Sequence, residues 1–284
     1  MARAISDVVG QVTWKHWVGG SMAAVGMNVG ILGGMVGVYR WIYADELESN
    51  KKFAATYGTV PSERHRMEAF AYAAEKWDKT MGKAEETGAD LYRKQLLVKA
   101  KGDILEVAVG TGRCFSMLEE TASVKSFVGV DKVQEMLDVA EKKLSGLGFP
   151  ARLVRADSKK LPFPDRSFDT VIGSLCLCSV EHPVESLNEM ARVCRENGRI
   201  LLVEPGLSKY GPVREAQDWL GLVPDPRHAW VTGWFDNREP SKLVRKADRL
   251  KLVSIETSKL GNWYMITAVP RVPQDVATST HGDE

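Results

Sequence analysis

From residue 103 onward the chain alternates short apolar runs with stretches whose apolar residues recur at helical spacing. Strands are expected at residues 104–108, 127–130, 152–155, 170–175 and 199–203, and helical stretches follow the first, second and fourth of them. Strands that alternate with helices are typical of a parallel sheet with helices on both faces. The pattern therefore predicts an α/β fold built on a doubly wound sheet.

The C-terminal part departs from a purely parallel arrangement. Residues 251–256 and 263–269 have strand character and flank the turn pair Gly261-Asn262. Strands joined by so short a turn run antiparallel. We therefore expect an antiparallel hairpin at the edge of the sheet.

A glycine-rich turn, Gly110-Thr111-Gly112, follows the first strand. In a doubly wound sheet this loop lies at the topological switch point, where ligands bind. Glycine there lets the backbone approach a ligand where a Cβ would collide. Asp131 ends the next strand and is placed to accept hydrogen bonds from ribose hydroxyls. A glycine pair alone fits a packing turn equally well.

Acidic residues near this turn indicate the kind of ligand. Glu106 stands where a pyrophosphate-binding fingerprint has an apolar residue, and its charge suits a cationic or amino-bearing ligand. Asp157 and Ser158 end the third strand, where a carboxylate can accept a hydrogen bond from an adenine amino group. These residues point away from NAD and towards S-adenosylmethionine.

Five ordered motifs resemble those of class I S-adenosylmethionine-dependent methyltransferases. They are ILEVAVGTGR at 104–113, VD at 130–131, ADS at 156–158, LPFPDRSFD at 161–169 and GRILLVE at 198–204. Within that class the chain is most similar to the ubiquinone/menaquinone-biosynthesis branch, and particularly to Oms-type mitochondrial inner-membrane methyltransferase-like proteins. The features of this subgroup lie at residues 74–78, 177–183 and 228–239. The resemblance covers residues 67–269 and implies a Rossmann-like methyltransferase sheet.

The resemblance also implies roles for individual residues. Glu106, Gly110 and Gly112 would cradle the methionine moiety of the cofactor, Asp131 the ribose, Asp157 and Ser158 the adenine, and Ser174 would face the methyl group. The sequence departs from the family at Ala108, where the first glycine of the loop is usual. It departs again at Trp234, where a family stretch often has Cys, and this change affects the acceptor side.

No pattern identifies a catalytic group. Methyl transfer is a displacement at a sulfonium methyl, in which the protein chiefly aligns the nucleophile and excludes water. His182 is a candidate general base for a phenol or thiol acceptor, or else a loop histidine bonded to backbone, and His228 has the same two interpretations. The four cysteines lack the spacing of a zinc site, so we expect buried thiols and no metal.

An uncharged run at residues 17–39 indicates a membrane segment. As a helix it would reach about 34 Å, and a hydrocarbon core is about 30 Å thick. We expect one transmembrane helix over residues 17–41, with Gly26, Gly30 and Gly34 on one face against a partner helix. The alternatives are a glycine-rich buried helix and a targeting segment.

The expected organisation is a tail (1–16), a transmembrane helix (17–41), charged connecting helices (42–101), an S-adenosylmethionine-binding methyltransferase domain (102–270) and a C-terminal tail (271–284). Within the connecting part, an apolar stripe predicts an amphipathic helix that leans on the main domain. The stripe consists of Met67, Phe70, Ala71, Ala74, Trp77 and Met81. Lys plus Arg is 38 and Asp plus Glu is 37, which argues against nucleic acid as a partner.

Two functions are compatible with these features. The first is a membrane-anchored methyltransferase acting on a small or membrane-partitioned acceptor, such as a quinone precursor, a lipid or a thiol. The resemblance implies a single-pass protein of the mitochondrial inner membrane. The alternative is a non-catalytic accessory subunit or assembly factor of a respiratory complex in that membrane, because fold does not fix activity.

Overall fold

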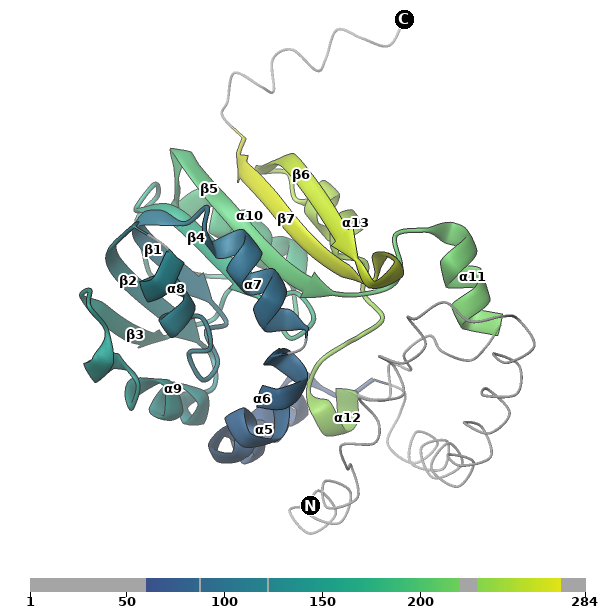
Figure 1. Cartoon of the computed structure of the whole chain (residues 1–284), viewed down its shortest axis with the longest axis horizontal. Helices are drawn as coiled ribbons and strands as arrows, with labels where there is room; N and C mark the ends of the chain where they lie inside the picture. Colours follow the sequence, from purple (N-terminus) through teal and green to yellow (C-terminus); the bar gives the residue numbers. More distant parts are fainter. Residues whose placement is uncertain (1–59, 87, 122, 220–228, 272–284) are drawn as a thin grey trace, which may run out of the picture.

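The computed structural model describes residues 60–86, 88–121, 123–219 and 229–271. At its centre is a seven-stranded sheet of order β3-β2-β1-β4-β5-β7-β6 (Figure 1). The parallel strands are β1 (Lys101–Val107), β2 (Ser123–Asp131), β3 (Ala151–Arg155), β4 (Phe168–Ser174) and β5 (Cys194–Pro205). β6 (Leu250–Ser258) and β7 (Trp263–Pro270) form an antiparallel hairpin, and β7 also runs antiparallel to β5. The doubly wound sheet and its final hairpin are confirmed.

Helices cover both faces of this sheet, which is why its parallel strands are apolar along most of their length. Side chains of a strand alternate between the two faces. Ile104 packs with α7 (Ala89–Leu97) and α8 (Phe115–Thr121), and Leu105 packs with α10 (Pro183–Val193) and α13 (Pro240–Lys246). Figure 1 shows α7 and α8 on the near face and α10 behind the sheet.

The strand order places the topological switch point of the sheet at the carboxyl end of β1. β1 lies between β2 and β4, so the connections out of β1 and β4 leave in opposite directions. The loops that follow the five parallel strands emerge at one edge, the carboxyl edge. In sheets of this kind, ligands bind outside this edge at the switch point.

Two helices before the sheet lie near the carboxyl edge. α5 (Glu63–Ala73) begins at Ser62, whose Oγ accepts a hydrogen bond from the His65 amide at 3.3 Å, and a 3-10 turn (Ala74–Lys76) separates α5 from α6 (Trp77–Glu86). The predicted amphipathic helix is therefore broken into two. Its stripe packs as expected on the main domain: Phe70 and Ala74 are buried with Met136 of α9 (Gln134–Glu141).

The turn between β6 and β7 is larger than the predicted pair. The short helix η4 (Lys259–Gly261) precedes Asn262, and Lys259, Leu260 and Gly261 all have left-handed φ angles, of 47°, 56° and 84°. The segment after β5 holds this turn: the Gly206 and Lys209 amides and the Ser208 hydroxyl donate to carbonyls of the turn, and the Gly206 carbonyl accepts from the Asn262 side chain. Because these contacts are long-range, the dipeptide alone did not indicate them.

Part of the predicted organisation lies outside the described residues. This applies to the tail at 1–16, to the transmembrane helix at 17–41 with Gly26, Gly30 and Gly34, to His228, and to residues 272–284. In the described part of the chain, no helix has both the length and the apolarity needed to cross a bilayer.

Candidate functional site

Glu106 lies at the carboxyl end of β1 and is the most deeply buried acid of the glycine loop region, with 2% of its surface exposed. It shares the face of Ile104, towards α7 and α8. Burial raises the pKa of its carboxyl to about 7, although a hydrogen bond from Cys114 and the charge of Arg93 act in the opposite direction. Within the described residues its Oε2 has no hydrogen-bond partner. A buried, unpartnered carboxylate oxygen is costly unless a ligand completes it.

Arg93 brings a buried guanidinium to the same place. It comes from α7, is 4% exposed, and donates from Nε to Ser174 Oγ at 2.7 Å and from Nη1 to Asp90 Oδ1 at 2.6 Å. Asp90 also pairs with Arg113 at 2.5 Å. Ser174 ends β4 at the carboxyl edge, as predicted, but its hydroxyl is held by Arg93. Arg93 thus joins α7 to the end of β4, and its charge acts on Glu106 at the end of β1.

The glycine loop follows β1 with three left-handed residues, Ala108 (φ 57°), Gly110 (φ 54°) and Gly112 (φ 77°). A Cβ at Gly110 would meet no atom within 4 Å, so this glycine faces open space, as a ligand cradle requires. A Cβ at Gly112 would lie 2.4 Å from the Phe115 ring. Gly112 is therefore required by packing onto α8, in contrast to the expectation that its missing side chain leaves room for a ligand. Ala108 takes the strained conformation that glycine adopts easily.

Asp131 ends β2 and organises this loop. Its Oδ2 accepts the Gly110 amide at 2.9 Å and its Oδ1 accepts the Val133 amide at 2.9 Å. Burial raises the pKa of its carboxyl, and these two backbone bonds oppose the rise. A carboxylate oxygen can accept more than one hydrogen bond, so ribose hydroxyls can still be received.

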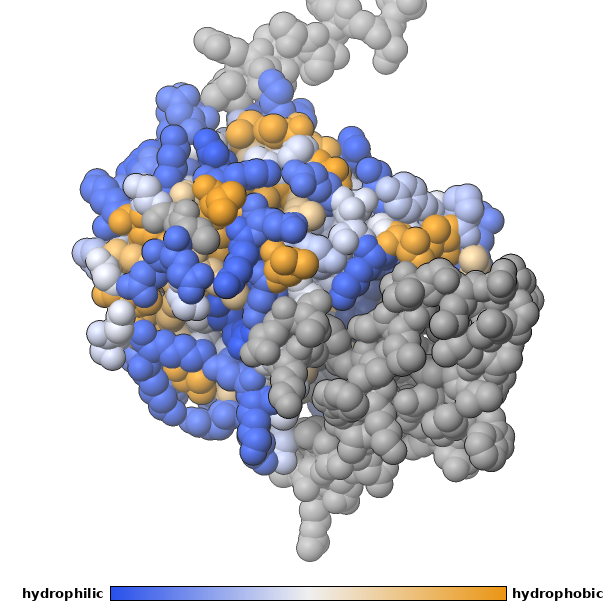
Figure 2. All heavy atoms as spheres, viewed as in Figure 1, coloured by the Kyte–Doolittle hydropathy of each residue, from blue (hydrophilic) through white to orange (hydrophobic). Residues whose placement is uncertain are grey.

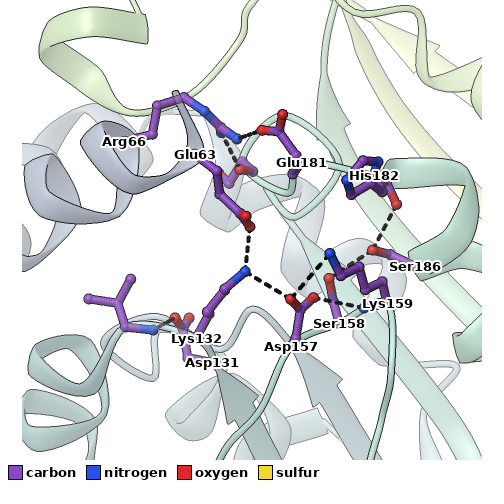
Figure 3. A network of polar contacts seen from close by, with 12 residues as sticks. Glu63, Arg66, Asp131, Lys132, Asp157, Ser158, Lys159, Glu181, His182 and Ser186 are labelled. Carbon is purple, nitrogen blue, oxygen red and sulfur yellow. Dashed lines mark hydrogen bonds and ion pairs between the residues drawn. The ribbon is translucent and has the colours of Figure 1, made fainter. Parts of the chain in front are cut away.

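Asp157 and Ser158 follow β3, and Asp157 belongs to a polar network (Figure 3). Lys132 Nζ lies 2.8 Å from Asp157 Oδ2 and 2.6 Å from Glu63 Oε1 of α5. Burial acts to raise the pKa of Asp157, but the hydrogen bonds and charges of Lys132 and Lys159 together outweigh it and the pKa is lowered. Ser158 Oγ lies 2.7 Å from Ser186 Oγ of α10. The network ties α5 to the loops after β2 and β3.

The segment after β4 is fixed from several sides. Glu204 at the end of β5 is fully buried and accepts the amides of Cys176 and Leu177 at 2.9 and 3.0 Å. Burial raises the pKa of Glu204 to about 8, against these backbone bonds. Arg66 of α5 donates to Ser179 O at 2.6 Å and pairs with Glu181.

Two guanidiniums flank one aromatic ring beside this segment. The Arg66 and Arg238 guanidinium carbons lie 4.8 and 4.6 Å from the centre of the Phe235 ring. Arg238 also donates to Val180 O at 2.6 Å and to Leu177 O. Cation–π contacts and backbone bonds together hold the segment after β4 in place.

His182 lies at the start of α10, next to the network in Figure 3. Its side chain is 47% exposed and its Nδ1 lies 3.7 Å from Glu185. Its carbonyl accepts bonds from the Ser186 amide and hydroxyl, both at 3.0 Å. Its role as a general base stays a prediction. Cys176 and Cys178 are buried, as expected, and lie in the turn that follows the end of β4 at Ser174.

Sequence reasoning missed the basic residues of this region. Arg66 and Arg93 lie on helices whose sequences show no motif, and Lys132 follows Asp131 directly, but only the fold brings the three together. Glu204 could have been found, because like Asp131 and Asp157 it is an acid that ends an apolar strand.

A sheet of this order, with a buried carboxylate before the glycine loop and acids at the ends of the next two strands, defines a nucleoside-binding α/β class suited to a cationic ligand. The "Methyltransferase domain" family matches residues 105–202, from β1 to β5. A phosphatidylethanolamine N-methyltransferase of Cereibacter sphaeroides is 33% identical over 177 residues, which cover 60% of this chain and 82% of that protein.

Other relatives match over a smaller share of their own length. The mitochondrial methyltransferase OMS1 of Saccharomyces cerevisiae is 27% identical over 62% of this chain and 40% of that protein. A demethylmenaquinone methyltransferase of Thermus thermophilus is 36% identical over 41% of this chain and 56% of that protein. A solved S-adenosylmethionine-dependent methyltransferase from Mesorhizobium loti shares the fold, with a TM-score of 0.51 and 16% identity over 66% of this chain and 99% of that one.

The chain belongs to the S-adenosylmethionine-dependent methyltransferase family. Its cofactor is therefore S-adenosylmethionine. The site fits this molecule, because the unpartnered Oε2 of Glu106 suits an ammonium group and Gly110 faces open space.

Proposed function

We propose that this protein transfers the methyl group of S-adenosylmethionine to a small or membrane-partitioned acceptor: a quinone precursor, a lipid or a thiol. The observation that carries the cofactor half of this proposal is the buried, unpartnered carboxylate oxygen of Glu106 at the switch point. The acceptor half is supported by relatives named for phosphatidylethanolamine and demethylmenaquinone, one a lipid and the other a quinone.

Each group of the site then has a role. Glu106 holds the amino group of the methionine moiety, while Arg93 offsets the negative charge and orients Ser174. Asp131 receives the ribose, and Asp157 with Ser158 receives the adenine. The cofactor supplies an electrophilic methyl group. With the cofactor bound, the acceptor would bond to the methyl carbon as the sulfur–carbon bond breaks, the sulfur would keep that electron pair, and a neutral acceptor would give up its proton to a base or to water.

The segment after β4 serves as the acceptor wall. Arg66, Arg238 and Glu204 bind its backbone from three different elements, which keeps it in place and excludes water. Orientation of the acceptor relative to the methyl group supplies much of the rate of such a displacement. His182 at the end of this wall is our candidate base for acceptors that must lose a proton.

We place the protein in the mitochondrial inner membrane with a single span over residues 17–41. The uncharged run at 17–39 and the similarity to mitochondrial OMS1 support this location. A partner helix could approach closely at Gly26, Gly30 and Gly34, because glycine has no side chain beyond Cα.

Titration calorimetry with S-adenosylmethionine tests the cofactor half. We expect binding by the wild type and a loss of about 1 to 3 kcal/mol in Asp131→Ala, since charge-assisted bonds to the ribose disappear. Transfer of radiolabelled methyl into a membrane lipid extract tests the acceptor half. Absence of binding heat at millimolar cofactor would rule out the enzyme.

The second candidate, a non-catalytic accessory subunit, is favoured by one observation. The carboxylates assigned to the nucleoside are already bonded within the chain: Asp131 to two amides and Asp157 to Lys132 and the Lys159 amide. A scaffold would keep these bonds permanently. It would bind no cofactor, and it would migrate in a large assembly on native gels.

A further inference from the structure

The tip of the β6–β7 hairpin and the segment after β5 form one exposed unit, which we name the tip unit (residues 206–214 and 258–262). Ser208 Oγ donates to Leu260 O at 2.6 Å, and the Lys209 amide donates to Gly261 O at 3.0 Å. A Cβ at Gly261 would lie only 2.9 Å from the Tyr210 ring. The two segments are therefore held closely together.

The tip unit presents its apolar side chains to solvent. Leu260 is 52% exposed and Tyr210 is 49% exposed. Figure 2 shows apolar atoms on the surface where the hairpin tip approaches the start of α11 (Gly211–Trp219). Large exposed side chains of this kind mark contact with another phase or another molecule when they gather at one place.

The backbone conformation at Leu260 adds a second, independent observation. Leu260 has φ 56° and ψ 32°, and it follows Lys259, which is also left-handed. A branched residue in this region costs free energy that glycine would avoid. Strain of this kind persists where the surrounding bonds enforce it, and it concentrates at functional positions. At Leu260 this backbone strain holds an apolar side chain that is exposed to solvent.

The charge of the tip unit is of one sign. Its charged residues are Lys209, Arg214 and Lys259, and residues 206–214 and 258–262 contain no Asp or Glu. Lys259 Nζ lies 5.7 Å from the centre of the Trp263 ring. The nearby Glu239 is bound by Arg214 at 3.1 Å and by Lys242 at 2.9 Å. Two further acids, Glu215 and Asp218, follow along α11 outside the unit.

The tip unit lies at the carboxyl edge of the sheet, the edge of the candidate site. Trp263, the first residue of β7, pairs with Pro205, the last residue of β5. The turn that precedes Trp263 therefore projects beyond the same edge as the loops that follow β1 to β4.

We propose that the tip unit docks on an anionic lipid bilayer. Leu260 inserts among the acyl chains, Tyr210 lies at the level of the headgroups, and Lys209 with Lys259 contacts their phosphates. Leucine, tyrosine and lysine side by side provide the chemistry of a membrane interface. The bilayer then faces the candidate site, so a membrane-partitioned acceptor would enter without crossing water. The entry route rests on the proposed function, whereas the lipid contact does not.

The test uses the full chain in phosphatidylcholine vesicles that contain an anionic phospholipid. An environment-sensitive fluorophore is attached at Leu260→Cys or, as control, at Val98→Cys. All four native cysteines are buried. Val98 is 58% exposed and precedes β1, at the opposite edge. Both labelled proteins carry the proposed membrane span at residues 17–41, so membrane attachment through that segment cannot produce a difference between the two labels.

We expect the label at 260 to shift to shorter wavelength and to be quenched several-fold more by nitroxide lipids than the label at 98. Lys209→Glu should reduce that quenching several-fold, and Lys125→Glu, at the opposite edge, should leave it unchanged. Equal quenching at both positions would overturn the proposal. So would a label at 260 that is shielded from both lipid and aqueous quenchers, since a protein would then cover the tip. Calorimetry with S-adenosylmethionine on the same vesicles tests the proposed function separately.

Discussion

At the residue scale, the buried carboxylate of Glu106 lowers the stability of the fold when it is ionised, and the same charge is what we propose binds the amino group of the cofactor. Burial raises its pKa to about 7 from the usual 4.5. In the unfolded chain the group ionises near its usual pKa, so the folded state holds the proton more tightly. The group therefore contributes stability at low pH, and this contribution is lost as pH rises from about 4.5 to about 7.

We predict that Glu106→Gln flattens this part of the stability profile. At about pH 8 the variant should be more stable than the wild type by up to about 3 kcal/mol, and it should bind S-adenosylmethionine more weakly because the carboxylate is gone. Urea unfolding at low and high pH, with calorimetry, measures both. Glu141→Gln on the exposed face of α9 serves as control. Equal pH slopes in wild type and Glu106→Gln would contradict the prediction.

The two glycines of the loop should respond differently to the same substitution. Gly110→Ala should lower stability by about 1 kcal/mol through left-handed strain and should weaken cofactor binding, because the new methyl group enters open space. Gly112→Ala should lower stability by about 3 kcal/mol, since its methyl also meets the Phe115 ring. Thermal melts with and without cofactor distinguish them. A Gly110→Ala protein with full affinity would place the cofactor elsewhere.

At the scale of elements, α5 is held across the carboxyl edge by one lysine in particular. Lys132 pairs with both Glu63 and Asp157, and all three side chains are about a third exposed, being 38%, 30% and 29% accessible. Solvent screening limits such pairs to about 1 kcal/mol.

Lys132→Met should therefore destabilise the protein by about 1 kcal/mol, speed hydrogen exchange in α5, and move the pKa of Asp157 up towards its usual range. Lys142→Met is the matched control. Lys142 also links this region to the N-terminal helices, through Glu75, but that pair is 63% and 74% exposed. If both variants exchange alike in α5, the aromatic packing of Phe70 and Trp77 holds the helix instead.

Elements whose signals are local were predictable from the sequence. The strands were found from their apolar runs, α10 from the helical spacing of its apolar residues, and the hairpin from its glycine turn. Two features depend on tertiary contacts, about which the spacing of apolar residues carries no information. They are the break between α5 and α6 and the left-handed turn at Leu260. In the site, Glu106 and Asp131 were anticipated from their places at strand ends. Arg66 and Arg93 come from helices before the sheet, and Lys132, although it follows Asp131 directly, acquires its role only through contacts with α5 and the loop after β3.

For the whole molecule, removal of residues 1–43 tests the membrane span. We expect the truncated chain to melt cooperatively, since it keeps the seven-stranded sheet and the helices described on both of its faces. It should appear in the supernatant after alkaline carbonate extraction, while the full chain stays in the pellet. Extraction of the full chain into the supernatant would contradict the span.

Gly30→Leu tests the partner helix. Insertion should become easier, because leucine is more apolar than glycine, but close packing against another backbone should be lost. The variant should remain in the carbonate pellet and migrate as a smaller species on native gels. An unchanged large species would rule out this contact, and Val36→Leu, away from the glycine face, serves as control.

The antiparallel direction of β7 has a practical consequence for anyone handling this protein. β7 leaves the carboxyl edge at Trp263 and ends beside Leu250 at the opposite edge, where the Arg271 amide donates to Arg249 O at 2.7 Å. An affinity tag or biosensor linker attached beyond Arg271 would thus hold the molecule at the edge of the sheet opposite the carboxyl edge. Immobilised in this way, the protein would present the carboxyl edge, with the candidate site and the tip unit, outward to reagents and to supported lipid films.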